Sequence, residues 1–347
     1  MSSAQAEGSG RRGRLAILAG LIVAAGLGAV GSRVLLSGQP PSPERQARPI
    51  VQIVRQQPGL PDLSDMVDRL CPSVAVIVTR GADASTPGSG SPNTPAASLV
   101  SGDGWLLVAS SVLPKGQLDA IFGDGRRTPL SEVRQDPVSG LAIVKADGPT
   151  APALSFNDQA FPRVGQFGLA LNTPVGNGCS ATAAMIGSDF LADGGGPSGY
   201  VRLQPPPGSW AGGVPLFGTD GRLIGIGADD LAGTVIPAPV VSAIVDELVR
   251  NSLSPSISYG FRVIDYQAQL ATRLGNLRSG AGIALEQPKS AAARAGLQAG
   301  DIVTAVDDVP VSGASELSRA LDAQPDAATL SIQRNAQQLK LTIKRAH

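Results

Sequence analysis

The hydrophobic pattern divides the chain into one long apolar run, a polar stretch without periodicity, and many short apolar segments. The long run covers residues 15–31, reads LAILAGLIVAAGLGAVG and holds no charge. The short segments begin at residue 73, are rich in β-branched side chains, and are separated by turn residues at spacings of roughly 8–12 positions. This pattern is typical of an all-β sandwich or barrel rather than of a helical protein.

The short segments predict a series of strands. Residues 73–79 (SVAVIVT) are expected to form a buried strand, and residues 98–113 read as two strands joined by an Asp-Gly turn. Two stretches have helical spacing instead, residues 62–70 and residues 238–251, and the second closes the β-rich region. Further strands are expected at 118–122, 127–133, 141–145, 166–171, 181–187, 200–203, 214–217 and 223–227.

The N-terminal apolar run predicts a membrane segment. A helix over residues 15–36, at about 1.5 Å per residue, is long enough to cross about 30 Å of hydrocarbon. Three arginines precede it, which places the N-terminus inside. We expect a cytoplasmic tail at 1–14, an uncleaved signal anchor at 15–36 in the inner membrane, and a Pro-rich linker at 37–61. A cleaved signal peptide is the alternative.

Composition limits the chemistry. The chain has 347 residues, 43 Gly, 28 Pro and a formal net charge of zero, so we expect two folded domains and no nucleic-acid partner. Cys71 and Cys179 match no metal-binding spacing, and the one histidine is His347, so no metal or cofactor is expected. The two cysteines either pair as a disulfide outside the cytoplasm or remain buried thiols, and both alternatives stay open.

The C-terminal part carries the most specific motif. Residues 295–311 read AGLQAGDIVTAVDDVPV and resemble the bacterial PDZ signature AGL-x-x-GD-I-x-x-x-x-(D/N)-G-x-x-V, with Asp308 where that family prefers Gly. The resemblance implies a PDZ domain over 257–347, after a short linker at 252–256. A helix near 315–321 and strands at 261–263, 329–333 and 338–343 fit this assignment.

A second resemblance concerns residues 208–227, which read GSWAGGVPLFGTDGRLIGIG. They resemble the nucleophile loop of the HtrA (DegP/DegS-like) branch of chymotrypsin-fold serine proteases, which reads GNSGGPL and continues into a D-G hairpin and an I-G-I strand. The resemblance implies a trypsin-like double β-barrel over 62–251. The expected fold is therefore mainly β, a double barrel followed by a PDZ domain, with an N-terminal transmembrane helix.

The same resemblance implies a degenerate catalytic triad. Ser111, in GWLLVASSVL, stands where the family has its histidine, and Gly140, in DPVSGLAIVK, stands where it has its aspartate. Ala211 stands where the family has its nucleophilic serine. A serine protease needs a hydroxyl, an imidazole to take its proton and a carboxylate to orient that imidazole. We therefore expect no catalytic residues.

The peptide site implied by the PDZ resemblance lies between a carboxylate-binding loop and a helix. The family loop reads Y-(L/I)-G-(V/I), and this chain has SYGF in its place. The side-chain pocket beside it is expected to have an aromatic residue as its floor and a helix as its wall. The leucines of that wall can equally be plain core. The residues concerned are Ser258, Tyr259, Gly260, Phe261, Leu317 and Leu321.

These resemblances predict a membrane-anchored periplasmic pseudoprotease. It would bind peptide segments or C-termini of envelope proteins as a scaffold, a chaperone-like sensor or a regulator of an active protease. The first alternative is an active endopeptidase with an unconventional site, using Ser209 or a pair of serine with Lys115 or Lys145. The second is a purely structural partner within an HtrA-like oligomer, since family members commonly trimerise.

Overall fold

The computed structural model describes residues 62–345 with internal gaps, and all of its elements belong to the compact unit Pro58–His347. The gaps are 82–95, 149–150, 174–177, 189–198, 205–211, 229–232, 266–279, 288, 325 and 335–336. No helix in the described ranges is long and apolar enough to span a membrane. The predicted tail, anchor and linker (1–14, 15–36 and 37–61) lie outside these ranges.

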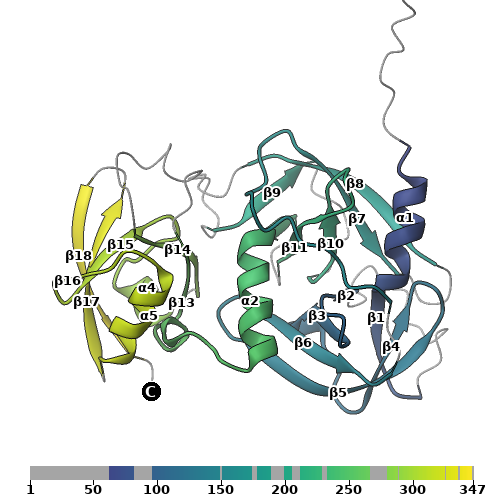
Figure 1. The fold of residues 1–347 in the computed structure, drawn as a ribbon, viewed down its shortest axis with the longest axis horizontal. Coiled ribbons are helices and arrows are strands. Elements are labelled where there is room, and N and C mark those ends of the chain that lie inside the picture. Colours follow the sequence, from purple (N-terminus) through teal and green to yellow (C-terminus); the bar gives the residue numbers. More distant parts are fainter. Residues whose placement is uncertain are drawn as a thin grey trace, which may run out of the picture. The chain divides into compact units, whose positions relative to one another are not determined.

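The first barrel follows a short helix, α1 (Ser64–Leu70), and a 3-10 turn, η1 (Cys71–Ser73). Its strands close in the order β1-β2-β3-β6-β5-β4, all antiparallel (Figure 1). Most of these strands consist of buried alanine and branched aliphatic residues. Because both faces of the strands are buried, their sequences are continuous apolar runs. They are β1 (Val74–Thr79), β2 (Ala96–Leu99), β3 (Trp105–Ala109), β4 (Leu118–Phe122), β5 (Arg127–Asp136) and β6 (Leu141–Ala146).

The second barrel closes in the order β10-β11-β12-β9-β8-β7. It is followed by α2 (Ala238–Arg250), which has Pro239 in its first turn and ends at Asn251 in the left-handed conformation (φ 53°). The strands are β7 (Phe167–Asn172), β8 (Ser180–Ile186), β9 (Val201–Gln204), β10 (Pro215–Phe217), β11 (Leu223–Gly227) and β12 (Thr234–Pro237).

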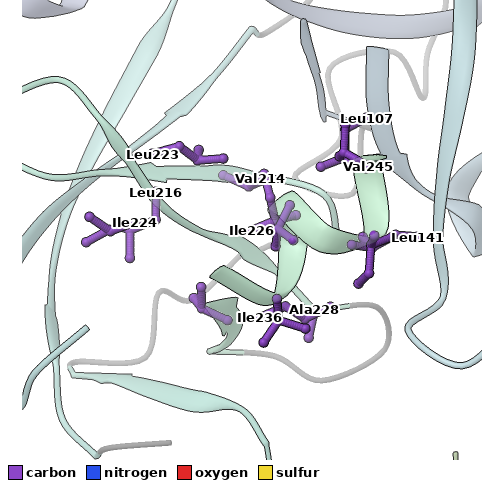
Figure 2. Close-up of a cluster of buried hydrophobic side chains, with 14 of the residues drawn as sticks. Leu107, Leu141, Val214, Leu216, Leu223, Ile224, Ile226, Ala228, Ile236 and Val245 are labelled. Carbon is purple, nitrogen blue, oxygen red and sulfur yellow. The ribbon is translucent and has the colours of Figure 1, made fainter. Parts of the chain in front are cut away.

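One apolar cluster joins the two barrels and α2. Leu107 and Leu141 of the first barrel belong to the same cluster as Ile226 and Ile236 of the second and Val245 of the helix (Figure 2). The helix contacts β5 and β6 as well as β11 and β12. The hydrophobic face of α2 therefore packs on both barrels.

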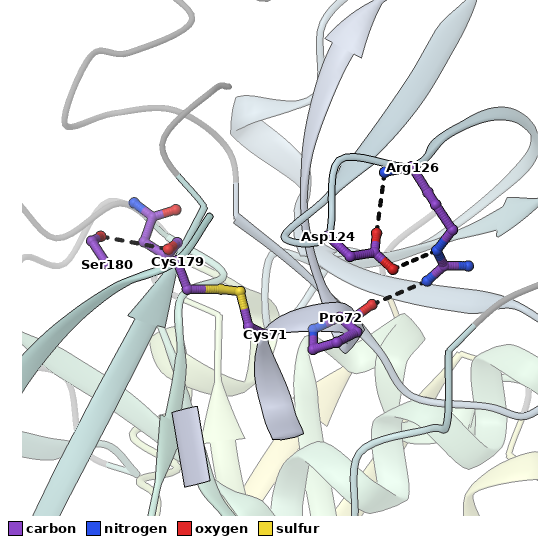
Figure 3. Close-up of a disulfide and its surroundings, with 7 residues drawn as sticks. Cys71, Pro72, Asp124, Arg126, Cys179 and Ser180 are labelled. Atoms are coloured by element: carbon purple, nitrogen blue, oxygen red, sulfur yellow. Dashed lines mark hydrogen bonds and ion pairs between the residues drawn. A yellow bond between two sulfur atoms is a disulfide. The ribbon is translucent and has the colours of Figure 1, made fainter. Parts of the chain in front are cut away.

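A disulfide also joins the two barrels. Cys71 of η1 pairs with Cys179, the residue before β8, with a Cα–Cα distance of 5.8 Å (Figure 3). Gly123, directly after β4, packs against both sulfurs, and a Cβ at this position would collide with the Cys71 sulfur and carbonyl oxygen. The structure thus contains the first of the two alternatives that the sequence left open.

The C-terminal elements form the PDZ sheet, in the order β13-β14-β15-β17-β18 with β16 beside β15. Asp308, in the turn before β16, has φ 66°, so it takes the left-handed conformation for which glycine is the usual choice. The elements are η3 (Pro255–Tyr259), β13 (Phe261–Asp265), β14 (Ala281–Glu286), α4 (Ala291–Arg294), β15 (Ile302–Val306), β16 (Val309–Pro310), α5 (Ala314–Asp322), β17 (Ala327–Arg334) and β18 (Gln337–Lys344).

The predicted fold class is confirmed for these parts: the chain is mainly β, with two barrels and a PDZ-like sheet. Nearly every expected strand is present. The sequence reading missed β12 because Thr234–Pro237 runs directly into α2 with no turn signal between them. The transmembrane helix stays a prediction.

Candidate functional site

Two of the three triad positions lie next to each other at one end of the first barrel. In the β3–β6 pair, Ala109 stands opposite Leu141. Just beyond this pair the Ser110 amide donates a hydrogen bond of 2.7 Å to the Gly140 carbonyl. Ser111 is exposed on the 3-10 turn η2 (Ser110–Val112). The fold therefore brings the two positions together, as the resemblance implies, but neither carries an imidazole or a carboxylate.

The loop of the third position reaches the same place. Gly213 has φ 87°, and a Cβ built on it would lie 2.8 Å from the Ala109 nitrogen and 2.8 Å from the Ala96 carbonyl oxygen. Only glycine allows this approach of the loop to β2 and β3. Ala211 stands two residues earlier; it and Ser209 lie outside the described residues.

The carboxylate of Asp136, four residues before Gly140, makes structural hydrogen bonds. Asp136 is 1% exposed and accepts from the Val138 amide at 3.2 Å, the Ser139 amide at 3.1 Å and the Ser139 hydroxyl. It also accepts from Arg262 Nε at 2.7 Å. Three of these four donors, two from the turn that leads to Gly140 and the third from the buried guanidinium, bind the same oxygen, Oδ2, and the fourth binds Oδ1. Asp136 is therefore a turn-forming residue rather than a triad acid.

The lysines considered as alternative bases lie elsewhere. Lys145 stands opposite Trp105, four residues along the β3–β6 pair from Ala109, which is about 13 Å at the rise of a strand. Its Nζ donates to the Asp103 carbonyl at 2.5 Å and to the Asp103 carboxylate at 3.1 Å. The Ser101 hydroxyl, and less strongly Lys145, hold the pKa of Asp103 below its ordinary value. Lys115 is exposed. No serine–lysine pair forms among the described residues.

The predicted carboxylate-binding loop is held firmly by its neighbours. The Ser258 hydroxyl donates to the Pro255 carbonyl at 2.7 Å and accepts from Arg345 Nε at 3.1 Å. Tyr259 is fully buried, its hydroxyl donates to the Gln324 carbonyl at 3.3 Å, and burial raises the pKa of this phenol.

The end of the loop is Gly260, which has φ 86° and packs on Ser290, where a Cβ would collide. This glycine is therefore required by the backbone.

The other residues of the predicted peptide site lie in the PDZ core. Phe261, Leu317 and Leu321 are each 0% exposed and belong to one cluster. The two leucines are thus packed as core in this structure, and their contact with a ligand stays a prediction. Strand β13, which begins at Phe261, is the outermost strand in the described part of the sheet, so no described strand pairs with its outer edge.

Two parts of the chain match known protein families. The trypsin-like peptidase domain family matches residues 96–226, and the PDZ domain family matches residues 282–334. A "Probable periplasmic serine endoprotease DegP-like" from Brucella suis biovar 1 (strain 1330) is 26% identical over 262 residues, 71% of this chain and 51% of that protein. The "Serine protease PepD" of Mycobacterium tuberculosis (strain ATCC 25618 / H37Rv) is 26% identical over 93% of this chain and 75% of its own length. The chain is therefore similar to HtrA-type proteins in both its trypsin-like peptidase domain and its PDZ domain.

The chain spans about half the length of the DegP-like relatives, 51% of the Brucella suis protein. Among solved structures, "HtrA-type protease AlgW with tripeptide" matches 82% of this chain and 97% of its own, at 23% identity and a TM-score of 0.49. Similarity to proteases concerns the framework of the site, whereas activity depends on the side chains at its reacting positions.

The sequence did not predict the contact that joins Arg262, Asp136 and Glu247 beside the site. Arg262 of β13 is 3% exposed and donates to Asp136 at 2.7 Å and, through Nη1, to Glu247 of α2 at 2.9 Å. Its Nη2 has no hydrogen-bond partner among the described residues. The available signal was a single arginine inside the apolar run FRVI, because a buried guanidinium requires carboxylate partners. Which carboxylates these would be could not be inferred from sequence spacing.

Proposed function

We propose that this HtrA-like protein is non-catalytic and acts by binding extended peptide segments or C-termini of proteins outside the cytoplasm. The observation that carries the proposal is the hydrogen bond from the Ser110 amide to the Gly140 carbonyl, which brings Ser111 and Gly140 to the place where the family holds its histidine and aspartate. The position that should hold a general base offers a hydroxyl, and the position that should hold the orienting acid offers only hydrogen.

Without these side chains, we expect little acceleration of peptide hydrolysis. An unactivated serine hydroxyl is a weak nucleophile, and removing the members of a triad leaves only the background supplied by binding and by the oxyanion hole. The chain's one histidine is its last residue, within the C-terminal part that carries the PDZ signature. Replacement of Ala211 alone therefore supplies a nucleophile without a base.

Peptide binding needs none of these groups. PDZ domains add an extended peptide to the edge of a sheet and hold its terminal carboxylate in a backbone loop. The features that support this role are the outer edge of β13, with which no described strand pairs, and the left-handed Gly260 directly before it. A scaffold, a chaperone-like sensor and a regulator of an active protease all use this one property.

An extracytoplasmic location is part of the proposal. The curated relatives are named as periplasmic, and the Cys71–Cys179 disulfide is of the kind that persists in oxidising compartments. We propose that residues 15–36 anchor the protein in the inner membrane. Membrane fractionation with alkaline washing tests this, because a protein released into the soluble fraction would contradict an uncleaved anchor.

Two measurements test the function. Fluorescence polarisation with labelled C-terminal peptides should show saturable binding that is lost when the terminal carboxylate is amidated. A fluorophosphonate probe should leave the protein unlabelled, and covalent labelling of Ser111 or Ser209 would overturn the non-catalytic assignment in favour of an active endopeptidase. If the protein binds no peptide and is not labelled by the probe, only the structural role in an oligomer remains.

A further inference from the structure

A hollow of about 360 Å³ opens where the outer edge of β13 faces α2 and α5. Its lining includes Val263 and Asp265 of β13, Ala314 and Ser318 of α5, and Asp246 of α2. The edge strand on which a PDZ domain assembles its ligand therefore borders a cavity that also has a wall from the barrel domain.

Side chains alternate along β13, so one face of the strand meets the α5 side of the hollow and the other face meets the α2 side. Phe261 packs in the PDZ core with Leu317 of α5, and Val263 packs against that core. Arg262, between them, points the other way and reaches Glu247 of α2. A peptide strand added to this edge has the same alternation, so one set of its side chains faces α5 and the other set faces α2.

The wall on the α2 side is acidic. Asp246 is exposed and has no hydrogen-bond partner among the described residues, and Asp158 lines the same hollow. Glu247 is paired with Arg262, which is itself shared with the buried Asp136, so this group keeps a net negative charge. No lysine or arginine is among the described residues that line the hollow.

We propose, resting on the peptide-binding function above, that this groove selects C-terminal peptides with lysine or arginine three residues before the terminal residue. With the terminal residue opposite Phe261, next to the loop that ends at Gly260, and its side chain directed at the PDZ core, an antiparallel peptide places its third preceding residue opposite Ile264. By the alternation of the strand that side chain faces α2 and Asp246, whereas the second preceding residue faces α5. A cation there meets carboxylates without a competing basic side chain.

The expected selectivity is modest and depends on salt. An exposed ion pair contributes about 0.2–1 kcal/mol, which converts to a change of roughly 1.4- to 5-fold in Kd. The preference should shrink as ionic strength rises, because the Debye length falls from about 10 Å at 0.1 M salt to about 3 Å at 1 M.

The test compares three labelled peptides that share an apolar C-terminus: one with lysine at the third preceding position, one with glutamine there, and one with lysine at the second preceding position. On the full chain, lysine at the third preceding position should bind about 1.4- to 5-fold more tightly than glutamine there. Lysine at the second preceding position should give no gain. Asp246→Asn should remove the preference, and Asp68→Asn, which neutralises an exposed aspartate on α1, should leave it intact.

A charge swap guards against a trivial loss of binding. With Asp246→Lys, a peptide carrying glutamate at the third preceding position should bind more tightly than its lysine counterpart. Binding that requires the free C-terminus but ignores the position and sign of the charge overturns this inference and leaves the proposed function standing. Absence of any C-terminus-dependent binding overturns both.

Discussion

Replacing Arg262 tests the buried ion pair that ties β13 to the barrel domain. Arg262 and Asp136 have side chains that are 3% and 0% exposed, and they are joined by a 2.7 Å hydrogen bond. Breaking a buried pair by removing one partner costs about 3–5 kcal/mol, because the other charge is left in a medium that solvates it poorly. In Arg262→Met, Asp136 keeps the two amides and the hydroxyl of its turn, so we expect a loss near the lower end, about 3 kcal/mol.

Asp136→Asn should cost at least as much. It removes the charge that Arg262 faces, leaving only Glu247, whose side chain is 21% exposed, and it weakens the turn before Gly140. The double variant leaves neither ion stranded at this contact, so its loss should be smaller than the sum of the two single losses by about 1–3 kcal/mol.

The assay is equilibrium urea unfolding of the full chain, with the disulfide intact, followed by far-UV circular dichroism. Lys340→Met is a matched control, since Lys340 pairs with Asp308 on the surface, where both side chains are more than half exposed, and should change stability by less than about 1 kcal/mol. Additive single losses, or an Arg262→Met loss as small as the control, would refute the coupling.

Three other predictions follow from the same structure. Reduction of the Cys71–Cys179 disulfide, which closes a span of 108 residues, should lower the free energy of unfolding by up to about 4–5 kcal/mol, visible as a lower Tm with reductant and absent in a Cys71→Ser/Cys179→Ser variant. Ala211→Ser should produce no turnover of a casein substrate, and clear turnover would contradict the loss of base and acid. Burial, and then the nearby Asp301, raise the pKa of Glu286, opposed by Arg334, and one carboxylate oxygen of Glu286 has no described partner. Its protonated form therefore favours the folded state below its ordinary pKa of 4.5, and this contribution is lost as pH rises through the folded pKa. Glu286→Gln should accordingly raise Tm at pH 7 and change it little at pH 4; an equal shift at both values would contradict the assignment.

Most strands could be predicted because burial on both faces imposes continuous apolar runs, and turn residues mark their ends. Residues 118–122 and 223–227 were placed with their observed bounds for this reason. The segment Thr234–Pro237 carries the same apolar character but no turn before the following helix, so no strand is predicted there from the pattern. Hydrophobic periodicity predicts helices and strands, but it does not mark the end of a strand when only the pairing with other strands defines that end.

The candidate site was predictable to the extent that it depends on framework. The β3–β6 register brings Ser111 beside Gly140, as the family's motifs implied. The contact between Arg262 and Asp136 was beyond reach, because 126 residues separate the two and either could have paired with another charge. The acidic wall of the groove was likewise invisible, since it forms only when α2 and β13 are placed side by side.

The segments around the proposed triad positions are under structural constraint whether or not the protein is catalytic. Gly140 has φ 70°, which a residue with a Cβ takes only at a cost of about 1–2 kcal/mol, so an aspartate restored there would carry backbone strain. Asp136, four residues earlier, shapes this turn and binds Arg262 of the strand that begins the PDZ sheet. The turn at Gly140, where the resemblance implies the family's acid, thus also seats β13 against the barrel domain through Asp136 and Arg262. Under the proposed peptide-binding function, the chain therefore needs this glycine and this buried aspartate for its framework.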